Sequence, residues 1–159
     1  MTSIETTPSA ILRHEEDLPF VDIGGGAQLQ VLQVDLANGV WVIRNRFEPG
    51  AIIPTHRHTG SVLAFTISGS WHYLEYSGEV NRAGSYLFEP AGSVHTLHVL
   101  DENEGITDVW FAITGANLNL NEHGEVEQVI DAATVLAYYR SACAAEHGIT
   151  DPPVVVVEA

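Results

Sequence analysis

The tripeptide His56-Arg57-His58 is the feature that most constrains this chain, because it lies within a segment of β-strand character, residues 50–69. Side chains on a strand alternate between two faces, so residues two apart point the same way. His56 and His58 therefore project together, while Arg57 points to the opposite face. Two adjacent imidazoles form half of a metal site, since histidine is the commonest metal ligand. Taken alone, such a pair is more typical of two surface histidines on an edge strand.

A second segment, residues 84–95, carries a third histidine and completes a recognisable pattern. The two segments together resemble the paired motifs of the cupin superfamily, G-x5-H-x-H-x3-E-x6-G and G-x5-P-x-G-x2-H. The match includes every glycine, the proline and all three histidines of the pattern: Gly50, His56, His58, Gly69, Gly84, Pro90, Gly92 and His95. The resemblance implies an all-β fold, a single-domain cupin built as a small double-sheet jelly-roll β-barrel.

One position departs from that pattern. The first motif usually carries a glutamate four residues after its second histidine, and this chain has Val62 there. Neither Val62 nor its neighbour Leu63 can bind a metal. The site that the resemblance implies therefore consists of three neutral imidazoles, those of His56, His58 and His95.

The remainder of the chain agrees with a barrel followed by a helix. Short β-prone segments recur every 8–12 residues with turns between them, which is typical of a sandwich or barrel. We expect a flexible arm over residues 1–17, the cupin barrel over 18–120, and a helix with a β-prone tail over 121–159, packed on the barrel. Asp131 is placed to cap a helix from about Ala132 to His147, and Gly148 is placed to end it.

Composition excludes several functions. The formal net charge of −15 disfavours nucleic acid, whose phosphates need a basic surface, and equally an anionic membrane. The six basic residues are all arginines, so lysine-based covalent chemistry is ruled out. The single cysteine, Cys143, suits a reducing compartment. No apolar run approaches the roughly 18 residues of a spanning helix, and no signal peptide is evident, so we expect a cytoplasmic protein.

Longer segments around the motifs narrow the resemblance. His-Arg-His-Thr-Gly, Gly-Ser-Trp-His-Tyr-Leu-Glu-Tyr, Gly-Ser-Tyr-Leu-Phe-Glu-Pro-Ala-Gly and Val-His-Thr-Leu resemble the 2,4′-dihydroxyacetophenone dioxygenase family. These enzymes, and the related acetylacetone-cleaving cupin dioxygenase, hold a non-haem Fe(II) with three histidines. The resemblance therefore implies an iron-dependent dioxygenase, whose partners are O₂ and a small ketone. It would cleave a carbon–carbon bond of an α-hydroxyketone or β-diketone, in the former case giving a carboxylic acid and formate.

Further candidate residues lie near the motifs. Glu89, beside Pro90, matches the position of an acidic residue behind the metal ligands in the acetylacetone-cleaving relative, although a glutamate at a strand end is often simply exposed. His98, three residues after His95, is a candidate catalytic residue of the pocket or a hydrogen-bonded core histidine. His72 either lines the pocket or faces water.

Two other functions stay open at this point. The chain fits a metal-binding cupin that acts as a small-molecule sensor or binder, or a cupin isomerase that uses Zn²⁺ or Mn²⁺. Val62 weighs against the isomerase, because those enzymes commonly keep the carboxylate ligand. Imidazole sites also accept Zn, Ni and other divalent metals besides Fe(II). Small cupins are commonly dimers, so the resemblance implies a homodimer or higher homo-oligomer.

Overall fold

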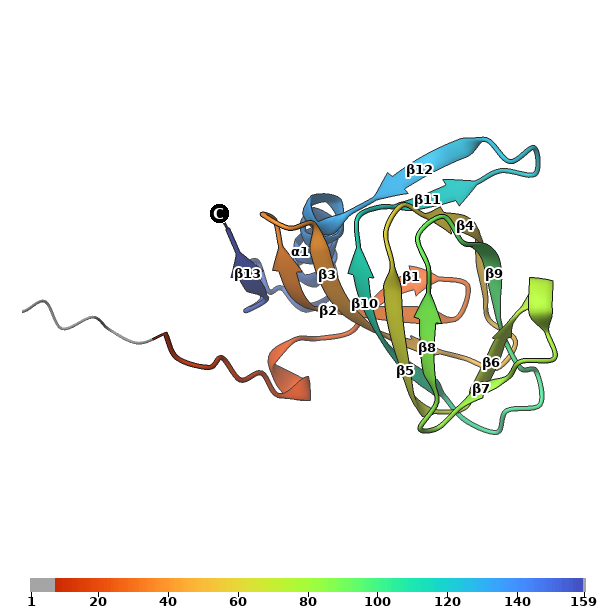
Figure 1. Ribbon diagram of the computed structural model, residues 1–159. Helices are drawn as coiled ribbons and strands as arrows, with labels where there is room; N and C mark the ends of the chain where they lie inside the picture. The colour runs from red at the N-terminus through yellow and green to blue at the C-terminus, as the bar shows by residue number, and fades with distance from the viewer. Residues whose placement is uncertain (1–7, 159) are drawn as a thin grey trace, which may run out of the picture.

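Two largely antiparallel sheets face each other and form a β-barrel, with one long helix beside an edge of the larger sheet (Figure 1). The computed structural model describes residues 8–158, so the first seven residues of the expected N-terminal arm and Ala159 lie outside the described residues. The larger sheet has seven strands, β1 (Val21–Gly24), β2 (Ala27–Asp35), β3 (Val40–Phe47), β10 (Thr107–Thr114), β5 (Val62–Ser68) and β8 (Tyr86–Glu89) in that order, with β13 (Val155–Val157) beside β2. The predicted all-β barrel of two sheets with a C-terminal helix is thereby confirmed.

The smaller sheet carries the histidine motifs. It has six strands in the order β12 (Val126–Ile130), β11 (Asn117–Leu120), β4 (Ile52–His58), β9 (Val94–Val99), β6 (Ser70–Tyr73) and β7 (Asn81–Arg82). Two short 3₁₀ turns, η1 (Glu15–Asp17) and η2 (Leu74–Tyr76), complete the elements outside the helix. Because the first histidine motif forms β4 and the second ends in β9, which pair directly, the two motifs meet side by side in one sheet.

The core is formed by the alternate side chains of each strand that point into the barrel. In β5, Val62, Ala64 and Thr66 are buried inside the barrel, whereas the residues between them point outward. Trp71 and Tyr73 of β6 are buried as well, and their rings meet edge to face at a centroid distance of 5.2 Å. Aromatic pairs of this geometry add packing energy beyond their buried area.

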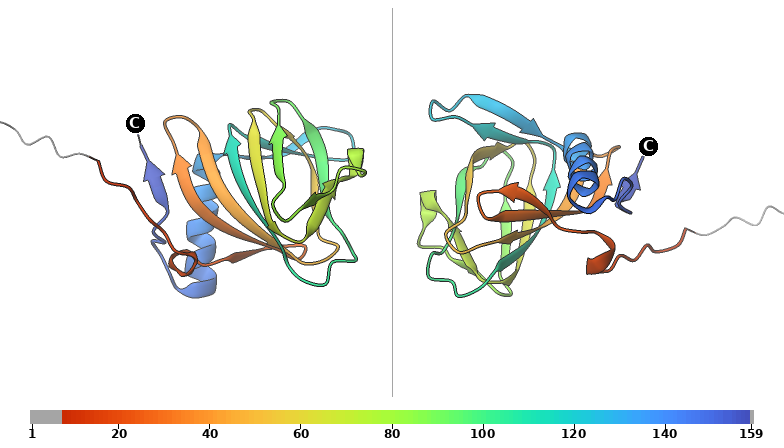
Figure 2. Two further views of the ribbon diagram at one scale, coloured as in Figure 1. Left: turned by 60° about the horizontal axis from the view of Figure 1, so that its bottom comes forward. Right: turned by 180° about the vertical axis from the view of Figure 1, so that it is seen from behind.

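The helix α1 (Ala132–His147) has the bounds that the sequence indicates. The Asp131 carboxylate accepts a hydrogen bond from the backbone N–H of Thr134, and Gly148 ends the helix with a left-handed φ of 69°. The apolar side of α1 packs on β1 and β2 (Figure 2). Its buried residues include the thiol-bearing Cys143. None of the helices in the described part of the chain is long and apolar enough to cross a bilayer.

The chain after β11 adds two strands that the sequence did not indicate clearly. β12 pairs with β11 and widens the smaller sheet, although most of its side chains are exposed, so it shows no buried stripe in the sequence. The β-prone C-terminal tail forms β13, which pairs in parallel with β2 of the same chain. The tail therefore closes an edge of its own barrel.

Candidate metal centre

Three buried histidines meet on the inner face of the smaller sheet. His56 of β4 lies directly opposite His95 of β9, and His58 lies two residues further along β4 on the same face. One ring nitrogen from each lies within 4.8 Å of the others. All three side chains are buried, and His95 has no exposed surface. The predicted convergence of His56, His58 and His95 is what the geometry shows.

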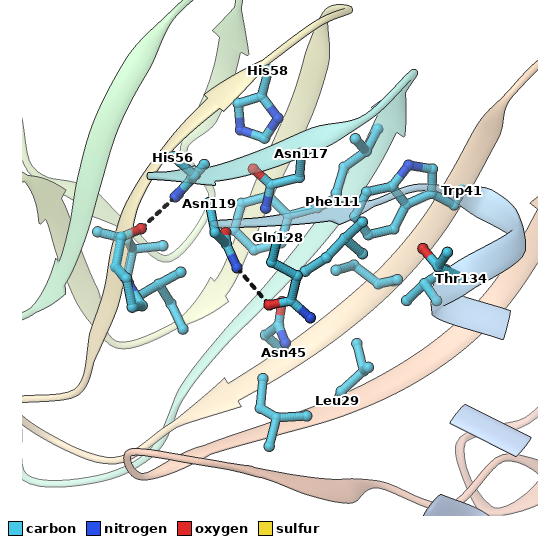
Figure 3. A pocket seen from close by; sticks show the side chains of 18 of the residues that line it. Leu29, Trp41, Asn45, His56, His58, Phe111, Asn117, Asn119, Gln128 and Thr134 are labelled. Atoms are coloured by element: carbon cyan, nitrogen blue, oxygen red, sulfur yellow. Dashed lines mark hydrogen bonds between the residues drawn. The ribbon is translucent and has the colours of Figure 1, made fainter. Parts of the chain in front are cut away.

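Local structure fixes the orientation of His56. Pro54 removes one hydrogen-bond donor from β4, and the pairing of β4 with β9 shifts between Ile53 and His56. The ring N–H at Nδ1 of His56 donates to the Pro54 carbonyl oxygen at 2.7 Å, drawn as a dashed line in Figure 3. With the proton held at Nδ1, the Nε2 lone pair is left for a metal.

Two tyrosines fix the position of His95. The ring of Tyr73 stacks on the imidazole at a centroid distance of 3.8 Å and an angle of 12°. The Tyr76 hydroxyl oxygen lies 3.4 Å from His95 Nδ1. His95 Nε2 lies 3.7 Å from the Glu89 carboxylate and has no hydrogen-bond partner among the described residues.

Burial keeps the three rings neutral. It lowers the pKa of His56, lowers that of His58 to about 4, and lowers that of His95 to about 3, with smaller effects from the neighbouring histidines on the latter two. A charged imidazole loses its hydration in such a place, so the neutral form is favoured. Neutral imidazoles are the form that binds metals, so the cluster is in its ligating state at neutral pH without losing protons.

Glu89 lies beside this cluster. Its carboxylate oxygens are 3.4 Å from His58 Nε2 and 3.7 Å from His95 Nε2, and the side chain is only 2% exposed. The Tyr73 hydroxyl donates a hydrogen bond to it. Burial raises the pKa of Glu89 to about 8 in the metal-free protein, and a bound cation would favour the ionised form. The alternative of an exposed strand-end glutamate is therefore wrong.

Glu89 also lies beside the position of Val62. In the larger sheet Val62 of β5 pairs directly with Glu89 of β8, and both side chains are buried on the inner side. The carboxylate of Glu89 therefore lies one strand away from the position at which the cupin pattern has its glutamate, and it approaches the histidines from the opposite sheet.

The donor set fits a divalent transition metal. Three buried imidazoles from two adjacent strands converge, and buried polar atoms of the group, His58 Nδ1, His95 Nε2 and Glu89 Oε2, lack hydrogen-bond partners within the described residues. Buried polar groups without partners are costly, and a bound cation would satisfy ring nitrogens of this kind. Nitrogen donors of this type suit Fe, Zn, Ni and Cu rather than Mg or Ca.

The cluster opens onto a largely apolar cavity of about 440 Å³ inside the barrel (Figure 3). Apolar side chains such as Trp41 and Phe111 form much of its wall. Its polar lining includes a set of amides, Asn45, Asn117, Asn119 and Gln128. Neither arginine nor lysine occurs among the described residues that line it.

The amides lie in register with the histidines. Asn117 and Asn119 of β11 are the cross-strand partners of His58 and His56 in β4, and Gln128 of β12 pairs with Asn119. Asn119 donates to Gln128 at 3.1 Å, whereas the side-chain oxygen of Asn117 has no partner among the described residues. Sequence reasoning missed these amides and the roles of Tyr73 and Tyr76. The spacing Asn117-x-Asn119 matches His56-x-His58, but only the strand pairing shows that they are neighbours.

His98 does not reach the cavity, which corrects its prediction as a pocket residue. It stands three residues after His95 on β9, and an odd offset places its side chain on the opposite face of the sheet. There His72 of β6 lies directly across from it, with His72 Nε2 and His98 Nδ1 2.9 Å apart. His72 likewise lies outside the pocket.

Comparison with known proteins agrees with this fold. The family model described as the ChrR cupin-like domain matches residues 8–111, and the chain belongs to this family within the cupin superfamily. A cupin-like protein of unknown function from Ralstonia eutropha JMP134 is 32% identical, with 98% of this chain and 97% of that chain covered and a TM-score of 0.87.

Two more distant structures share the fold. An acetylacetone dioxygenase from Acinetobacter johnsonii is 19% identical, with 89% of this chain and 97% of that chain covered and a TM-score of 0.72. The anti-sigma protein ChrR of Rhodobacter sphaeroides, in complex with SigE, is 19% identical over 64% of this chain and 52% of that chain, with a TM-score of 0.53. The search of curated proteins gives no match.

Proposed function

We propose that this protein is a non-haem Fe(II)-dependent dioxygenase that cleaves a carbon–carbon bond of an α-hydroxyketone or β-diketone with O₂. The observation that carries the proposal is a cluster of three neutral, buried imidazoles, with Val62 in place of the usual carboxylate, at the wall of a largely apolar cavity. The overall fold is shared with an acetylacetone dioxygenase. The resemblance of the motif segments to the 2,4′-dihydroxyacetophenone dioxygenases supports the same class.

In this proposal His56, His58 and His95 hold the iron. Bound Fe(II) supplies Lewis acidity toward an enolisable ketone and the electrons for O₂. Three neutral ligands would add no negative charge to the metal, which favours an anionic form of the substrate such as an enolate. The carboxylate of Glu89, held by the Tyr73 hydroxyl, is placed to hold or release a proton beside His58 and His95.

The lining and volume of the cavity indicate the chemical character of the part of the substrate that lies away from the metal. Its apolar wall suits an aromatic ring or an alkyl chain, and a volume of about 440 Å³ accommodates a small molecule. Because no cationic side chain is among its described lining residues, the substrate should carry no carboxylate or phosphate at its far end. Amide groups beside the histidines are suited to neutral hydroxyl or carbonyl groups.

The test is oxygen uptake by protein loaded anaerobically with Fe(II), against a panel of hydroxyacetophenones and β-diketones. We expect one O₂ consumed per substrate, with a carboxylic acid and formate released from hydroxyacetophenones, and no uptake in His95→Ala. Fe(II) that loads tightly while no panel member consumes O₂ would contradict the assignment.

A metal-dependent sensor is the second candidate, because the matched family is named for ChrR, which is an anti-sigma protein. A sensor should bind metal and a small molecule without turnover. The same oxygen experiment separates the two, since only the dioxygenase converts the ligand that it binds.

A further inference from the structure

A row of polar side chains crosses the inner face of the smaller sheet and continues the line of histidines. Gln128 of β12 pairs with Asn119 of β11, which in turn pairs with His56 of β4. His56 pairs with His95 of β9. Since β12 is the edge strand, the row runs from the histidine cluster to the border of the sheet. Adjacent strands lie about 4.8 Å apart, so the amides begin one strand spacing from the nearest imidazole.

Asn117 stands in the next row on the same face. It lies two residues before Asn119 on β11, so both side chains point inward, and its cross-strand partner is His58. Both amides line the cavity beside the histidines (Figure 3). A small molecule that is held at the histidines and extends by one strand spacing toward β11 therefore reaches Asn117.

Asn117 differs from the other amides of the cavity in its hydrogen bonds. Asn119 donates to the side-chain oxygen of Gln128 at 3.1 Å, and Asn45 donates to the backbone carbonyl oxygen of Gln28 at 3.0 Å. In contrast, Oδ1 of Asn117 is buried and has no hydrogen-bond partner within residues 8–158. A buried acceptor of this kind needs a donor, and here the donor has to come from a molecule in the cavity.

We propose that Asn117 is a specificity-determining residue, which accepts a hydrogen bond from a hydroxyl group on the part of the substrate that does not bind the metal. The proposal rests on the proposed function, because it takes the ketone end of the substrate to lie at His56, His58 and His95. The substrate class that follows is a ketone with an additional, neutral hydroxyl group. A β-diketone with only alkyl substituents would leave the Asn117 oxygen unpaired.

The lining of the cavity favours a hydroxyl group over other polar groups. A carbonyl or ether oxygen has no proton to donate to Asn117. An ammonium group would lose its hydration and would need a nearby carboxylate. Among the described lining residues the one carboxylate is that of Glu89, which lies beside His58 and His95. A neutral O–H group meets the need of Asn117 without placing a charge in the apolar part of the cavity.

The test is isothermal titration calorimetry of the full chain loaded with Zn²⁺, which imidazole sites accept and which binds ligands without turnover. The ligands are meta- and para-hydroxyacetophenone, acetophenone, and para-methoxyacetophenone, whose ring oxygen has no proton to donate. We expect at least one hydroxylated ligand to bind the wild type about tenfold or more tightly than acetophenone does. The methoxy ligand should show no such preference.

Asn117→Leu removes the acceptor but keeps a side chain of similar size, so the preference for the hydroxylated ligand should fall below about twofold. Asn117→Ala removes the same acceptor without adding bulk. The matched comparison is Asn119→Leu, which alters an amide on the same strand and face whose side chain is already bonded to Gln128. It should keep the preference, whatever its effect on overall affinity. Circular dichroism establishes that each variant is folded.

A wild type that binds acetophenone as tightly as both hydroxylated ligands would overturn the proposal. So would folded Asn117→Leu and Asn117→Ala variants that keep the preference, or an Asn119→Leu variant that loses it to the same extent. Failure of the proposed dioxygenase is distinguishable, because it would be seen as absent O₂ uptake by the Fe(II)-loaded protein, whereas the preference for a hydroxyl group is measured without turnover.

Discussion

Five histidines lie on one sheet of this barrel, and the two faces of that sheet use them differently. On the inner face, His56, His58 and His95 are buried, and ring nitrogens of His58 and His95 lack hydrogen-bond partners within the described residues. On the outer face, His72 and His98 are bonded to each other. The two groups share the strand β9, so the chemistry of each follows from the direction of its side chains.

The two histidines on the outer face, His72 and His98, are held by hydrogen bonds. His72 Nδ1 lies 3.0 Å from the Ser77 carbonyl oxygen and therefore donates to it, which leaves His72 Nε2 to accept from His98 Nδ1. In the inner group, one ring nitrogen of each histidine lies within 4.8 Å of those of the others, and no hydrogen bond joins the three rings among the described residues. Buried ring nitrogens without hydrogen-bond partners indicate a cation site, whereas histidines that are hydrogen-bonded to their neighbours indicate a structural role.

The largest effect expected from this comparison is on metal content. His95→Ala removes one of three ligands, so we expect bound Fe or Zn per chain to fall from about one to near zero after dialysis. His98→Ala, on the same strand but the outer face, is the matched control and should keep its metal. Elemental analysis of both variants measures this. Equal loss in both variants would contradict the distinction between the faces.

Glu89 should matter for activity more than for metal retention. Glu89→Gln keeps the shape of the side chain but removes its negative charge beside the histidines. We expect metal content near that of the wild type and a fall in kcat of roughly 10- to 100-fold. Tyr73→Phe, which removes the hydrogen bond to Glu89, should give a smaller fall in the same direction. Steady-state oxygen uptake measures both, and a complete loss of metal in Glu89→Gln would instead make Glu89 a ligand.

The stability of the metal-free protein should depend on pH through the inner group. The pKa values of His58 and His95 are about 4 and 3 when folded, against 6.5 for an ordinary histidine. The unfolded chain therefore takes up protons below pH 6.5 that the folded chain does not, and the free energy of unfolding falls as pH falls toward 4. We expect a loss of the order of a few kcal/mol, measured by urea unfolding in the presence of a chelator.

Glu89 should act in the opposite direction at higher pH. Its pKa is about 8 when folded, against 4.5 ordinarily, so the unfolded chain ionises first and folded stability falls as pH rises from 4.5 through 8. Glu89→Gln lacks this ionisation. Its stability relative to the wild type should therefore increase between pH 5 and pH 8. An unchanged difference over that range would show that Glu89 is ionised in the folded metal-free protein.

The smallest effect is expected on the outer face. His72→Ala removes the hydrogen bond to His98 at a partly exposed position, which should cost about 1 kcal/mol of unfolding free energy or less. Metal content and oxygen uptake should stay at wild-type values. A change in metal content or in oxygen uptake would mean that the outer pair influences the metal centre or the cavity.

The sequence predicted what local spacing determines. The three histidines and Gly50, Gly69 and Gly84 fall at the intervals of the cupin motifs, so the resemblance implied both the barrel and the cluster. The period of a strand also placed His56 and His58 on one face. The same rule applied from His95 to His98 would have put His98 on the outer face, because their separation is odd.

Groups brought in by strand pairing could not be found in this way. Asn117 and Asn119 are about 60 residues from the histidines that they accompany, and only the register of β11 with β4 makes them neighbours. Glu89 was a candidate through its match to an acidic residue of the acetylacetone-cleaving relative, but only the strand pairing shows that it lies beside Val62 in the opposite sheet. The contacts of Tyr73 with both His95 and Glu89 depend on the closure of the barrel.

The most direct test of the account is a crystal structure of the Fe(II)-loaded protein with anomalous diffraction measured at the iron edge. We predict a single anomalous peak within coordinating distance of ring nitrogens of His56, His58 and His95, with Glu89 beside it and hydrogen-bonded to Tyr73. A peak at His72 and His98, or no peak at the inner group in protein that retains its iron, would contradict the central claim.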